Sequence, residues 1–365
     1  MNSMLTFDEL QTPSVLVDRA RMEANIRSLQ AACDAQGVEL RPHIKTHKMV
    51  QVARRQLAAG ARGLTCAKLG EAEAMLPSGV RSLFVAHSLV DPRQAPRISA
   101  LAGRLDDFRL AVSSEAHAEA FLRLAALTGK KLSVMLAIDT GLGREGARDD
   151  DAARRIAAAL AGSRHVELRG FYSHEGNFYG IPAAEQAARV EEMLGRLCTL
   201  RDSIDRGLSV WPGCSVSARL VVSASRGRVQ AVRPGAYVFG DMSLSKSNNV
   251  MRPEEVALHV LATVVDKPEP GLALIDAGSK TFSSDRTAAN VFAIAADGRD
   301  LAVMRVNEEH GYVRGAAVDA LRVGERILFM PAHVCTVVNL TDEVVVTENG
   351  NVVDTWRVDA RGCIR

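Results

Sequence analysis

Short apolar runs alternate with longer amphipathic segments from about residue 13 to residue 240. Runs such as residues 14–18 (SVLVD) and 132–139 (LSVMLAID) are rich in aliphatic residues and predict strands. Segments such as residues 115–129 (EAHAEAFLRLAALTG) have helical spacing and end at a glycine. About eight such strand–helix units predict a (β/α)8 barrel. The alternative, an open doubly wound sheet, usually carries a glycine-rich fingerprint after its first strand, and this sequence has none there.

The pattern changes after about residue 245, where β-rich segments are separated by turn signals. The dipeptide Asn349-Gly350 lies between EVVVT and NVVDTW, and this arrangement is a strong signal for a β-hairpin. We therefore expect two domains, a barrel over residues 13–245 and an antiparallel β domain over residues 246–365. Residues 1–12 are expected to join the β domain.

The chain has 365 residues, a formal net charge of +2, 47% hydrophobic residues and 24% charged residues. This balance is typical of a soluble globular protein and argues against a nucleic-acid-binding or membrane-surface protein. The six cysteines form no CxxC pair, and no apolar run approaches the roughly 20 residues of a membrane helix. Because the N-terminus also lacks the pattern of a signal peptide, we expect a cytoplasmic protein.

A barrel enzyme carries its reactive groups at the C-terminal ends of its strands. Lys45 directly follows the predicted strand VELRPHI at such an end, and His43, His47 and Lys48 surround it in the sequence. A lysine in a cleft can form a Schiff base with an aldehyde or a ketone. The simpler alternative is a solvated lysine at a strand exit.

The segment VRPGAYVFG follows near the end of the predicted barrel. Its Gly235 and Ala236 offer backbone N–H groups to an anion such as phosphate, whereas Pro234 has no such donor. The hydroxyl of Tyr237 could add a further donor. Barrel phosphate sites usually lie in the loops after the seventh and eighth strands, which is where this segment is expected. A plain turn is the alternative.

Nine motifs together resemble one known enzyme family. They occur in the family's order and cover nearly the whole chain: TPSVLVDRARMEANI, RPHIKTHK, GLTCAKLGEAEAM, IDTGLGREG, FYSHEGNFYG, VRPGAYVFGD, LIDAGSKTFSSD, NEEHG and PAHVCTVVNL. The sequence is thereby similar to the fold-type III pyridoxal phosphate enzymes of the D-serine dehydratase and D-threonine aldolase group. The resemblance implies a barrel of the alanine racemase type followed by a C-terminal antiparallel β domain.

The resemblance also implies roles at the cofactor. Lys45 would carry pyridoxal 5′-phosphate and, once released, act as the base at the α carbon. His174 and Tyr179 would flank the cofactor ring. Arg144 would contact either the phenolate or the ring nitrogen, and Arg233 is its rival for the ring nitrogen.

The same family places a Ser/Thr-rich loop at the cofactor phosphate. Ser217 would contribute to this loop, and Gly235, Ala236 and Tyr237 would complete the phosphate site. The local sequence CSVSARLV, which also contains Ser215, departs from the family's usual composition.

His333 and Cys335 lie two positions apart on a predicted strand, so both side chains are expected on one side of it. Imidazole and thiolate are good ligands for Zn²⁺. An isolated His-x-Cys pair is a weak signal, but D-serine dehydratase-like members of the family carry one here, which implies zinc or manganese. The resemblance further implies a homodimer.

The resemblance therefore implies a lyase that acts on a small-molecule β-hydroxy D-amino acid. The leading interpretation is a dehydratase that releases a 2-oxo acid and ammonia from D-serine or D-threo-3-hydroxyaspartate. Aldol cleavage to glycine and an aldehyde is the first alternative, and racemisation is the second. A non-catalytic carrier of pyridoxal phosphate is a third possibility, and the predicted β domain counts against it.

Overall fold

The computed structural model describes residues 9–365, and the chain divides into two compact units. The barrel unit consists of residues 27–45, 50–235 and 363–365. Of the described residues, the sheet unit contains residues 9–26, 46–49 and 236–362. The expectation for residues 1–12 falls mostly on residues 1–8, which lie outside the described part of the chain.

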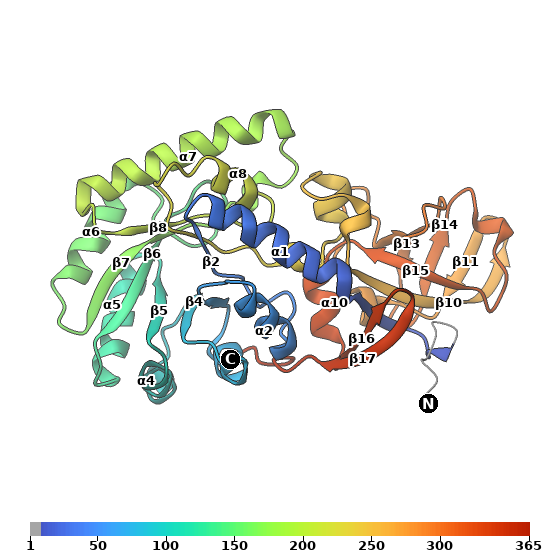
Figure 1. The fold of residues 1–365 in the computed structure, drawn as a ribbon, viewed down its shortest axis with the longest axis horizontal. Helices are drawn as coiled ribbons and strands as arrows, with labels where there is room; N and C mark the ends of the chain where they lie inside the picture. Colours follow the sequence, from blue (N-terminus) through green and yellow to red (C-terminus); the bar gives the residue numbers. More distant parts are fainter. Residues whose placement is uncertain (1–8) are drawn as a thin grey trace. The chain divides into compact units, whose positions relative to one another are not determined.

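The barrel unit is built from eight short parallel strands. Two of them pair with each other, and the other six form a sheet in chain order. The amide of Gln230 donates to Val210 O, and a bridge between His43 and Thr65 joins the remaining gap, so the strands close (Figure 1). The strands are β2 (Glu39–Leu40), β3 (Leu64–Cys66), β4 (Ser82–Ser88), β5 (Asp107–Val112), β6 (Leu132–Ala137), β7 (Val166–Tyr172), β8 (Ser209–Trp211) and β9 (Ala231–Val232).

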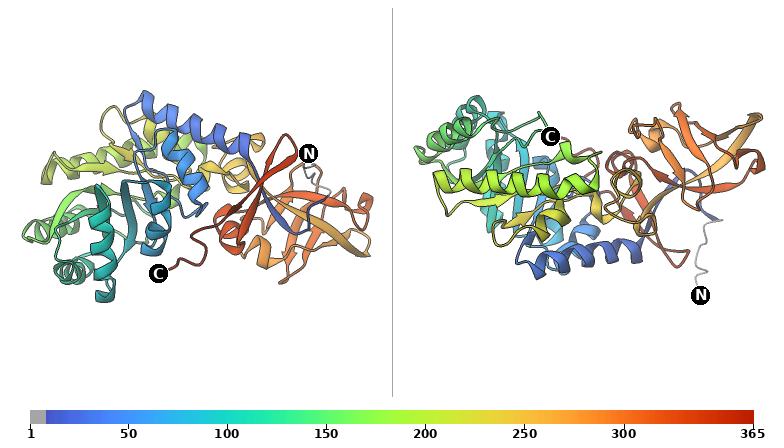
Figure 2. Two further views of the ribbon diagram at one scale, coloured as in Figure 1. Left: turned by 60° about the horizontal axis from the view of Figure 1, so that its bottom comes forward. Right: turned by 90° about the horizontal axis from the view of Figure 1, so that it is seen from above.

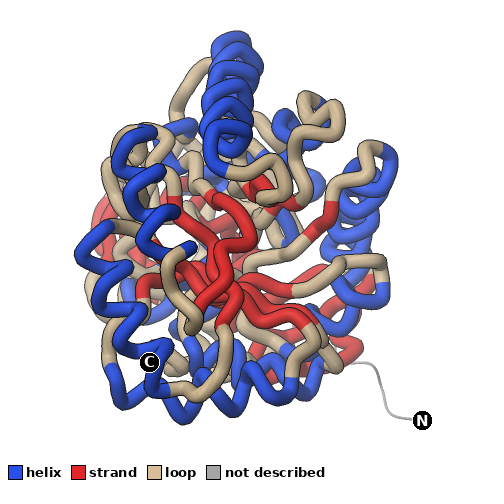
Figure 3. The backbone as a smooth tube through the Cα atoms, turned by 90° about the vertical axis from the view of Figure 1, so that its left-hand side faces the viewer, coloured by secondary structure: helices blue, strands red, loops and turns tan. Residues whose placement is uncertain are grey.

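Helices follow the strands and surround them (Figure 3). Several begin at the residue types that favour a helix start: Ser114 accepts from the amide of His117, and Asp149 accepts from that of Ala152. Within residues 9–365, no helix combines the length and the apolar character needed to cross a bilayer. The α-helices between residues 19 and 223 are α1 (Arg19–Ala35), α2 (Val50–Ala58), α3 (Leu69–Met75), α4 (Ala95–Arg104), α5 (Glu115–Leu127), α6 (Asp150–Ala161), α7 (Ala183–Ile204) and α8 (Ala218–Ser223).

Aromatic side chains fill the interior of the barrel. Phe84 contacts Tyr172 and Trp211 edge to face, with ring centroids 5.0 and 5.7 Å apart. The guanidinium groups of Arg41 and Arg109 lie over the Trp211 ring, 4.3 and 4.4 Å from its centroid. The indole therefore separates two buried or half-buried cations from the apolar core.

The sheet unit contains a nine-stranded sheet in the order β11-β14-β13-β12-β15-β10-β1-β16-β17. Figure 2 shows its C-terminal strands in orange and red. Neighbouring strands are antiparallel except for the pair β1 and β16. The predicted hairpin at Asn349-Gly350 is confirmed, because β16 and β17 pair on either side of it. The strands are β1 (Ser14–Asp18), β10 (Leu258–Glu269), β11 (Leu272–Ile275), β12 (Ala293–Ala295), β13 (Ala302–Val306), β14 (Gly311–Arg314), β15 (Arg326–Pro331), β16 (Glu343–Glu348) and β17 (Asn351–Arg357).

The predicted architecture of an alanine racemase-type barrel plus an antiparallel β domain is confirmed, but the expected first barrel strand is wrong. Residues 14–18 lie in the nine-stranded sheet, where Leu16 pairs with His259 and with Val345. A short apolar run shows that a segment is a buried strand, and it carries no information about which sheet the strand joins. Residues 236–245 likewise belong to the sheet unit.

Replacing Trp211 by alanine should lower the free energy of unfolding by about 3–5 kcal/mol, because the change leaves a cavity and removes the ring between two cations. Chemical denaturation followed by circular dichroism measures the change. Leu127→Ala is the control, because Leu127 is 62% exposed and its loss should cost less than about 0.5 kcal/mol. Equal effects of the two substitutions would contradict this view of the core.

Candidate functional site

Lys45 lies just past the C-terminal end of β2, as the sequence predicts. The pairing of this segment continues beyond the two-residue strand, since the amides of Arg41 and His43 donate to Val232 O and Pro234 O. The backbone N–H of Lys45 points to Nδ1 of His43 at 3.4 Å. The side chain of Lys45 is half-buried. The lysine is therefore held at the end of the barrel that carries the chemistry in this architecture.

Three of the predicted cofactor residues, Lys45, Arg144 and Arg233, lie near two neutral histidines, His43 and His174. Burial, together with the nearby charges of Lys45, Arg144 and Arg233, lowers the pKa of His174 to about 2. The pKa of His43 falls well below its usual value for the same reasons. Both imidazoles are therefore uncharged at physiological pH, and they act as neutral hydrogen-bonding groups.

Arg233 is a buried cation held in one orientation. Its Nη2 donates to Ser173 O at 2.5 Å, and its guanidinium lies 4.8 Å from the Tyr172 ring centroid and 5.4 Å from that of Phe84. Burial lowers its pKa, while the nearby Tyr172 and Glu175 act in the opposite direction. Contacts within the barrel interior thus fix the orientation of the Arg233 guanidinium.

Arg144 lies on an exposed loop after β6. Asp139 organises this loop by accepting from the amides of Gly141 and Gly143. A cavity of about 20 Å³, roughly the space of one water molecule, is lined by Arg144 together with Tyr172 and His174. The side chain of Arg144 therefore borders the same space as the imidazole of His174.

Sequence reasoning missed Tyr172, which also borders this cavity. Its hydroxyl is buried and has no hydrogen-bond partner among the described residues, and burial raises its pKa. The only signal was its position at the end of a predicted strand. Tyr179, which was predicted to flank the ring, follows the turn η4 (Gly176–Phe178) and is 37% exposed.

The predicted phosphate side needs one revision. Ser217 is fully buried, and its hydroxyl donates to Glu175 Oε2 at 2.9 Å, so its proton is not directed towards a ligand. Ser215 is half-buried instead, and its Oγ accepts from the amide of Gly235 at 3.1 Å. Ala236 and Tyr237 begin the short turn η5 (Ala236–Val238) and are buried.

His333 and Cys335 are not on a strand, so this part of the prediction is wrong. Strand β15 ends at Pro331, His333 caps the start of α10 (Val334–Leu340), and Cys335 lies in its first turn. The apolar run continues through the junction, so its pattern does not show where the strand ends.

The helix start nevertheless brings the two side chains together. Burial lowers the pKa of His333, but contacts with Cys335 and Asp241 outweigh this effect and raise it to about 11. His333 Nδ1 lies 2.9 Å from Asp241 Oδ2, and Asp241 is fully buried. A carboxylate that holds one imidazole nitrogen is the usual support for a metal-binding histidine, because it leaves the other nitrogen for the metal.

These residues fit a divalent metal with two protein ligands. Within residues 9–365, no group of three or more His, Cys, Asp or Glu side chains is arranged to hold a metal ion. A two-ligand site leaves the remaining positions for water or substrate, as catalytic zinc requires. The imidazole, the thiol and the carboxylate behind the imidazole therefore suit a catalytic metal better than a structural one.

The segment after Lys45 contacts this metal pair. Thr46 follows Lys45 in the chain, and its hydroxyl lies 3.1 Å from Cys335 Sγ. Lys48, the rival lysine, donates from Nζ to Asn339 Oδ1 at 2.8 Å. The amine of Lys48 is thus used within the sheet unit, and Lys45 remains the candidate for the cofactor.

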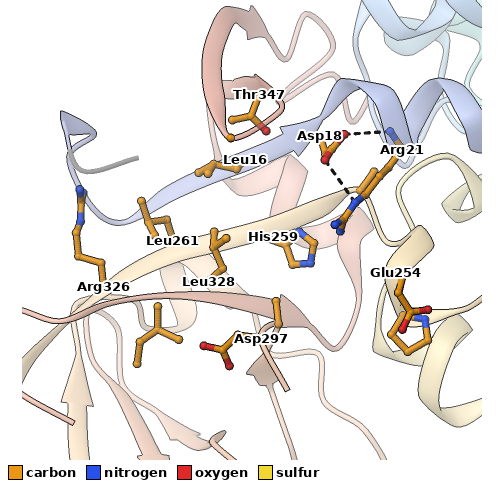
Figure 4. A pocket seen from close by; sticks show the side chains of 15 residues that line it. Leu16, Asp18, Arg21, Glu254, His259, Leu261, Asp297, Arg326, Leu328 and Thr347 are labelled. Carbon is orange, nitrogen blue, oxygen red and sulfur yellow. Dashed lines mark hydrogen bonds and ion pairs between the residues drawn. The ribbon is translucent and has the colours of Figure 1, made fainter. Parts of the chain in front are cut away.

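A separate pocket of about 550 Å³ lies on the sheet unit (Figure 4). Its lining includes Leu16, His259, Leu261 and Leu328, together with Arg326. Burial and the neighbouring Arg21 lower the pKa of His259 to about 4. None of the residues predicted to bind the cofactor or the metal lines this pocket.

Comparisons with known proteins agree with this arrangement. A family model described as alanine racemase, N-terminal domain, matches residues 17–243, and one described as a putative serine dehydratase domain matches residues 257–347. A D-threonine aldolase from Arthrobacter sp. is 30% identical over 364 residues, which cover 98% of this chain and 94% of that protein. A D-threo-3-hydroxyaspartate dehydratase from Delftia sp. (strain HT23) is 34% identical over 359 residues, which cover 92% of each chain.

Solved structures give the same result. The crystal structure of D-threonine aldolase from Filomicrobium marinum has a TM-score of 0.88 at 26% identity and covers 99% of both chains. A cysteine-to-alanine mutant of D-threo-3-hydroxyaspartate dehydratase in the metal-free form has a TM-score of 0.84 at 30% identity, and covers 97% of this chain and 98% of that one. This chain belongs to the fold-type III pyridoxal phosphate enzymes, in the family of the D-serine dehydratases and D-threonine aldolases.

Proposed function

We propose that the protein is a pyridoxal phosphate- and metal-dependent lyase that removes water from a β-hydroxy D-amino acid and releases a 2-oxo acid and ammonia. The observation that carries this proposal is the contact between Thr46 and Cys335. Thr46 is the residue that follows Lys45 in the chain. The segment that directly follows Lys45 in the chain thus contacts one of the two candidate metal ligands.

The residues at the barrel end suit the cofactor. Lys45 would hold its aldehyde carbon, and Ser215, whose Oγ accepts from the amide of Gly235, would donate its hydroxyl to the phosphate. Arg144 and Arg233 supply positive charge near its ring. When bound, pyridoxal phosphate supplies an electron sink that stabilises negative charge at the substrate α carbon.

Lys45 Nζ is the group that we assign to the α proton. It is half-buried at the strand end, and neutral His43 and His174 lie beside it without adding charge. These two imidazoles can orient the substrate through hydrogen bonds and help to exclude water. A base placed at a fixed position removes the proton from one face of the α carbon, which is consistent with action on D-amino acids.

His333 and Cys335 would hold the metal, with Asp241 fixing the imidazole. A metal there would supply Lewis acidity to the β-hydroxyl. The thiolate and imidazole favour zinc, with manganese as the alternative. A structure of the dehydratase relative is described as its metal-free form, which supports a metal requirement in this family.

Aldol cleavage to glycine and an aldehyde is the second candidate. The Arthrobacter relative, a D-threonine aldolase, supports it. The same metal and base could serve this reaction, since both reactions act at the hydroxyl-bearing β carbon. Racemisation is the third candidate, and the paired ligands His333 and Cys335 count against it, because proton exchange at the α carbon needs no metal.

A product assay separates these candidates. The protein is incubated with D-serine, D-threonine and D-threo-3-hydroxyaspartate, and 2-oxo acid, glycine and the L-enantiomer are measured. We expect 2-oxo acid and ammonia in equal amounts from at least one of the three substrates. Glycine as the main product would establish the aldolase, and the L-enantiomer alone would establish a racemase.

Lys45→Ala should abolish the visible absorbance band of lysine-bound pyridoxal phosphate, because it removes the amine that we assign to the cofactor aldehyde. Activity should fall at least about 1,000-fold, since both covalent attachment and the base are lost. Lys48→Ala is the matched control and should retain the band. Borohydride reduction followed by peptide mapping should place the pyridoxyl group on the peptide that contains Lys45. A label on another lysine would contradict the assignment.

His333→Ala and Cys335→Ala should each remove the bound metal, because a two-ligand site cannot lose half of its protein ligands. Metal content measured by inductively coupled plasma mass spectrometry should fall from about one per chain to below about one tenth. Production of 2-oxo acid should be lost with the metal and also after treatment with EDTA. Cys363→Ala is the control thiol substitution. Activity that survives complete chelation would reject the metal role.

We also propose a homodimer, which rests on the family resemblance alone. Sedimentation equilibrium of the protein with bound cofactor should give twice the chain mass of 39.2 kDa. A single chain mass over the micromolar range would contradict it.

A further inference from the structure

Glu175 is a buried carboxylate to which the reaction assigns no role. It is fully buried, although an isolated carboxylate is costly to remove from water. Ser173 Oγ donates to its Oε1 at 2.5 Å. The amides of Gly213 and Cys214 donate to its Oε2 at 2.9 and 3.1 Å, and the hydroxyl of Ser217 donates at 2.9 Å. Four donors therefore converge on one carboxylate.

Three of these donors belong to the loop that follows β8, the seventh strand of the barrel. Gly213 adopts a φ of +99°, and a Cβ there would lie 2.9 Å from Val232 Cγ1, so the backbone has little freedom to move. Gly213 O also accepts from the amide of Arg233. The loop is thus tied on one side to Glu175 and on the other to the segment that follows the eighth strand.

Ser215 lies within this loop and is half-buried, unlike its buried neighbours Cys214 and Val216. Its Oγ accepts from the amide of Gly235, so Ser215 and Gly235 lie next to each other. Loops after the seventh and eighth strands are where barrels bind phosphate. Because the neighbouring Cys214 and Ser217 are both anchored to Glu175, the position of Ser215 follows from that carboxylate.

Glu175 also interacts electrostatically with Arg233, which is predicted to lie beside the cofactor ring. Its charge opposes the loss of charge that burial imposes on Arg233. Removal of the carboxylate would take the acceptor from the buried amide of Gly213 and leave the amide of Cys214 with Ser217 Oγ alone. The carboxylate therefore connects the phosphate loop and Arg233.

We propose that Glu175 is a positioning residue that builds the phosphate subsite of the cofactor by fixing residues 213–217, without itself touching the cofactor. This inference rests on the proposed function, because it assumes that pyridoxal phosphate binds at Lys45. It assigns the phosphate to Ser215 and Gly235, and it assigns Ser217 to the support behind them.

The test compares pyridoxal phosphate with pyridoxal, which has the same aldehyde and ring but no phosphate. Apo-protein is titrated with each compound, and the visible absorbance of the lysine-bound form gives the Kd. Glu175→Gln keeps the size of the side chain and removes its charge. Glu191→Gln is the matched control, because Glu191 is a half-exposed partner of Arg228 in the same unit.

Glu175→Gln should raise the Kd for pyridoxal phosphate about 10- to 100-fold, the range expected for weakened hydrogen bonds to a charged group. The Kd for pyridoxal should change by less than about threefold, and Glu191→Gln should change neither. Should Glu175→Gln fail to fold, Ser217→Ala removes one anchor of the loop and should show the same selective loss.

Equal losses for the two compounds, or no loss for either, would overturn the inference and assign Glu175 a general structural role. If the unmodified protein gives no absorbance band with either compound, the proposed function itself fails. The two failures are therefore distinguishable.

Discussion

The structure depends on positive charge that is gathered at the C-terminal end of the barrel. Burial keeps His43 and His174 in the neutral form by lowering their pKa values, and the nearby charges of Lys45, Arg144 and Arg233 act in the same direction. Arg233 is buried, and Glu175 is the buried carboxylate that acts on it. An anionic cofactor with a phosphate and a phenolate would offset this excess of charge, which explains why so many cations can occupy one strand end.

The chain connects Lys45 directly to a short segment of the sheet unit. The chain leaves the barrel unit directly after Lys45, contributes residues 46–49 to the sheet unit, and returns to the barrel at Val50. In this short excursion Thr46 contacts Cys335 and Lys48 contacts Asn339. Both contacts involve α10, so residues 46–49 are held within the sheet unit at the helix that carries Cys335.

Much of the fold could be predicted from the sequence because its signals are local. Alternating strands and helices indicated the barrel, and Asn349-Gly350 indicated the hairpin. The sheet that residues 14–18 join could not be predicted, because strand pairing is a long-range property that apolar runs do not encode. The helical start at His333 was missed for a related reason, since the apolar run continues from β15 into α10 without a clear stop.

Some residues of the candidate site could be predicted from the sequence, and others could not. Lys45, Arg144, His174 and Arg233 were found from motifs, and the structure brings all four together. Glu175 and Tyr172 were missed, although Glu175 lies within one of the motifs, because only the fold shows that its partners are the loop amides at Gly213 and Cys214. Ser217 was assigned to the phosphate from its place in the sequence, and only the hydrogen bond to Glu175 shows that its hydroxyl is already used.

The most direct test of the central claim is a crystal structure of the protein grown with pyridoxal phosphate. The account predicts continuous electron density from Lys45 Nζ to the aldehyde carbon of the cofactor, with the phosphate at Ser215 and Gly235. An amine at position 45 that points into solvent, with the cofactor absent or bound elsewhere, would contradict it.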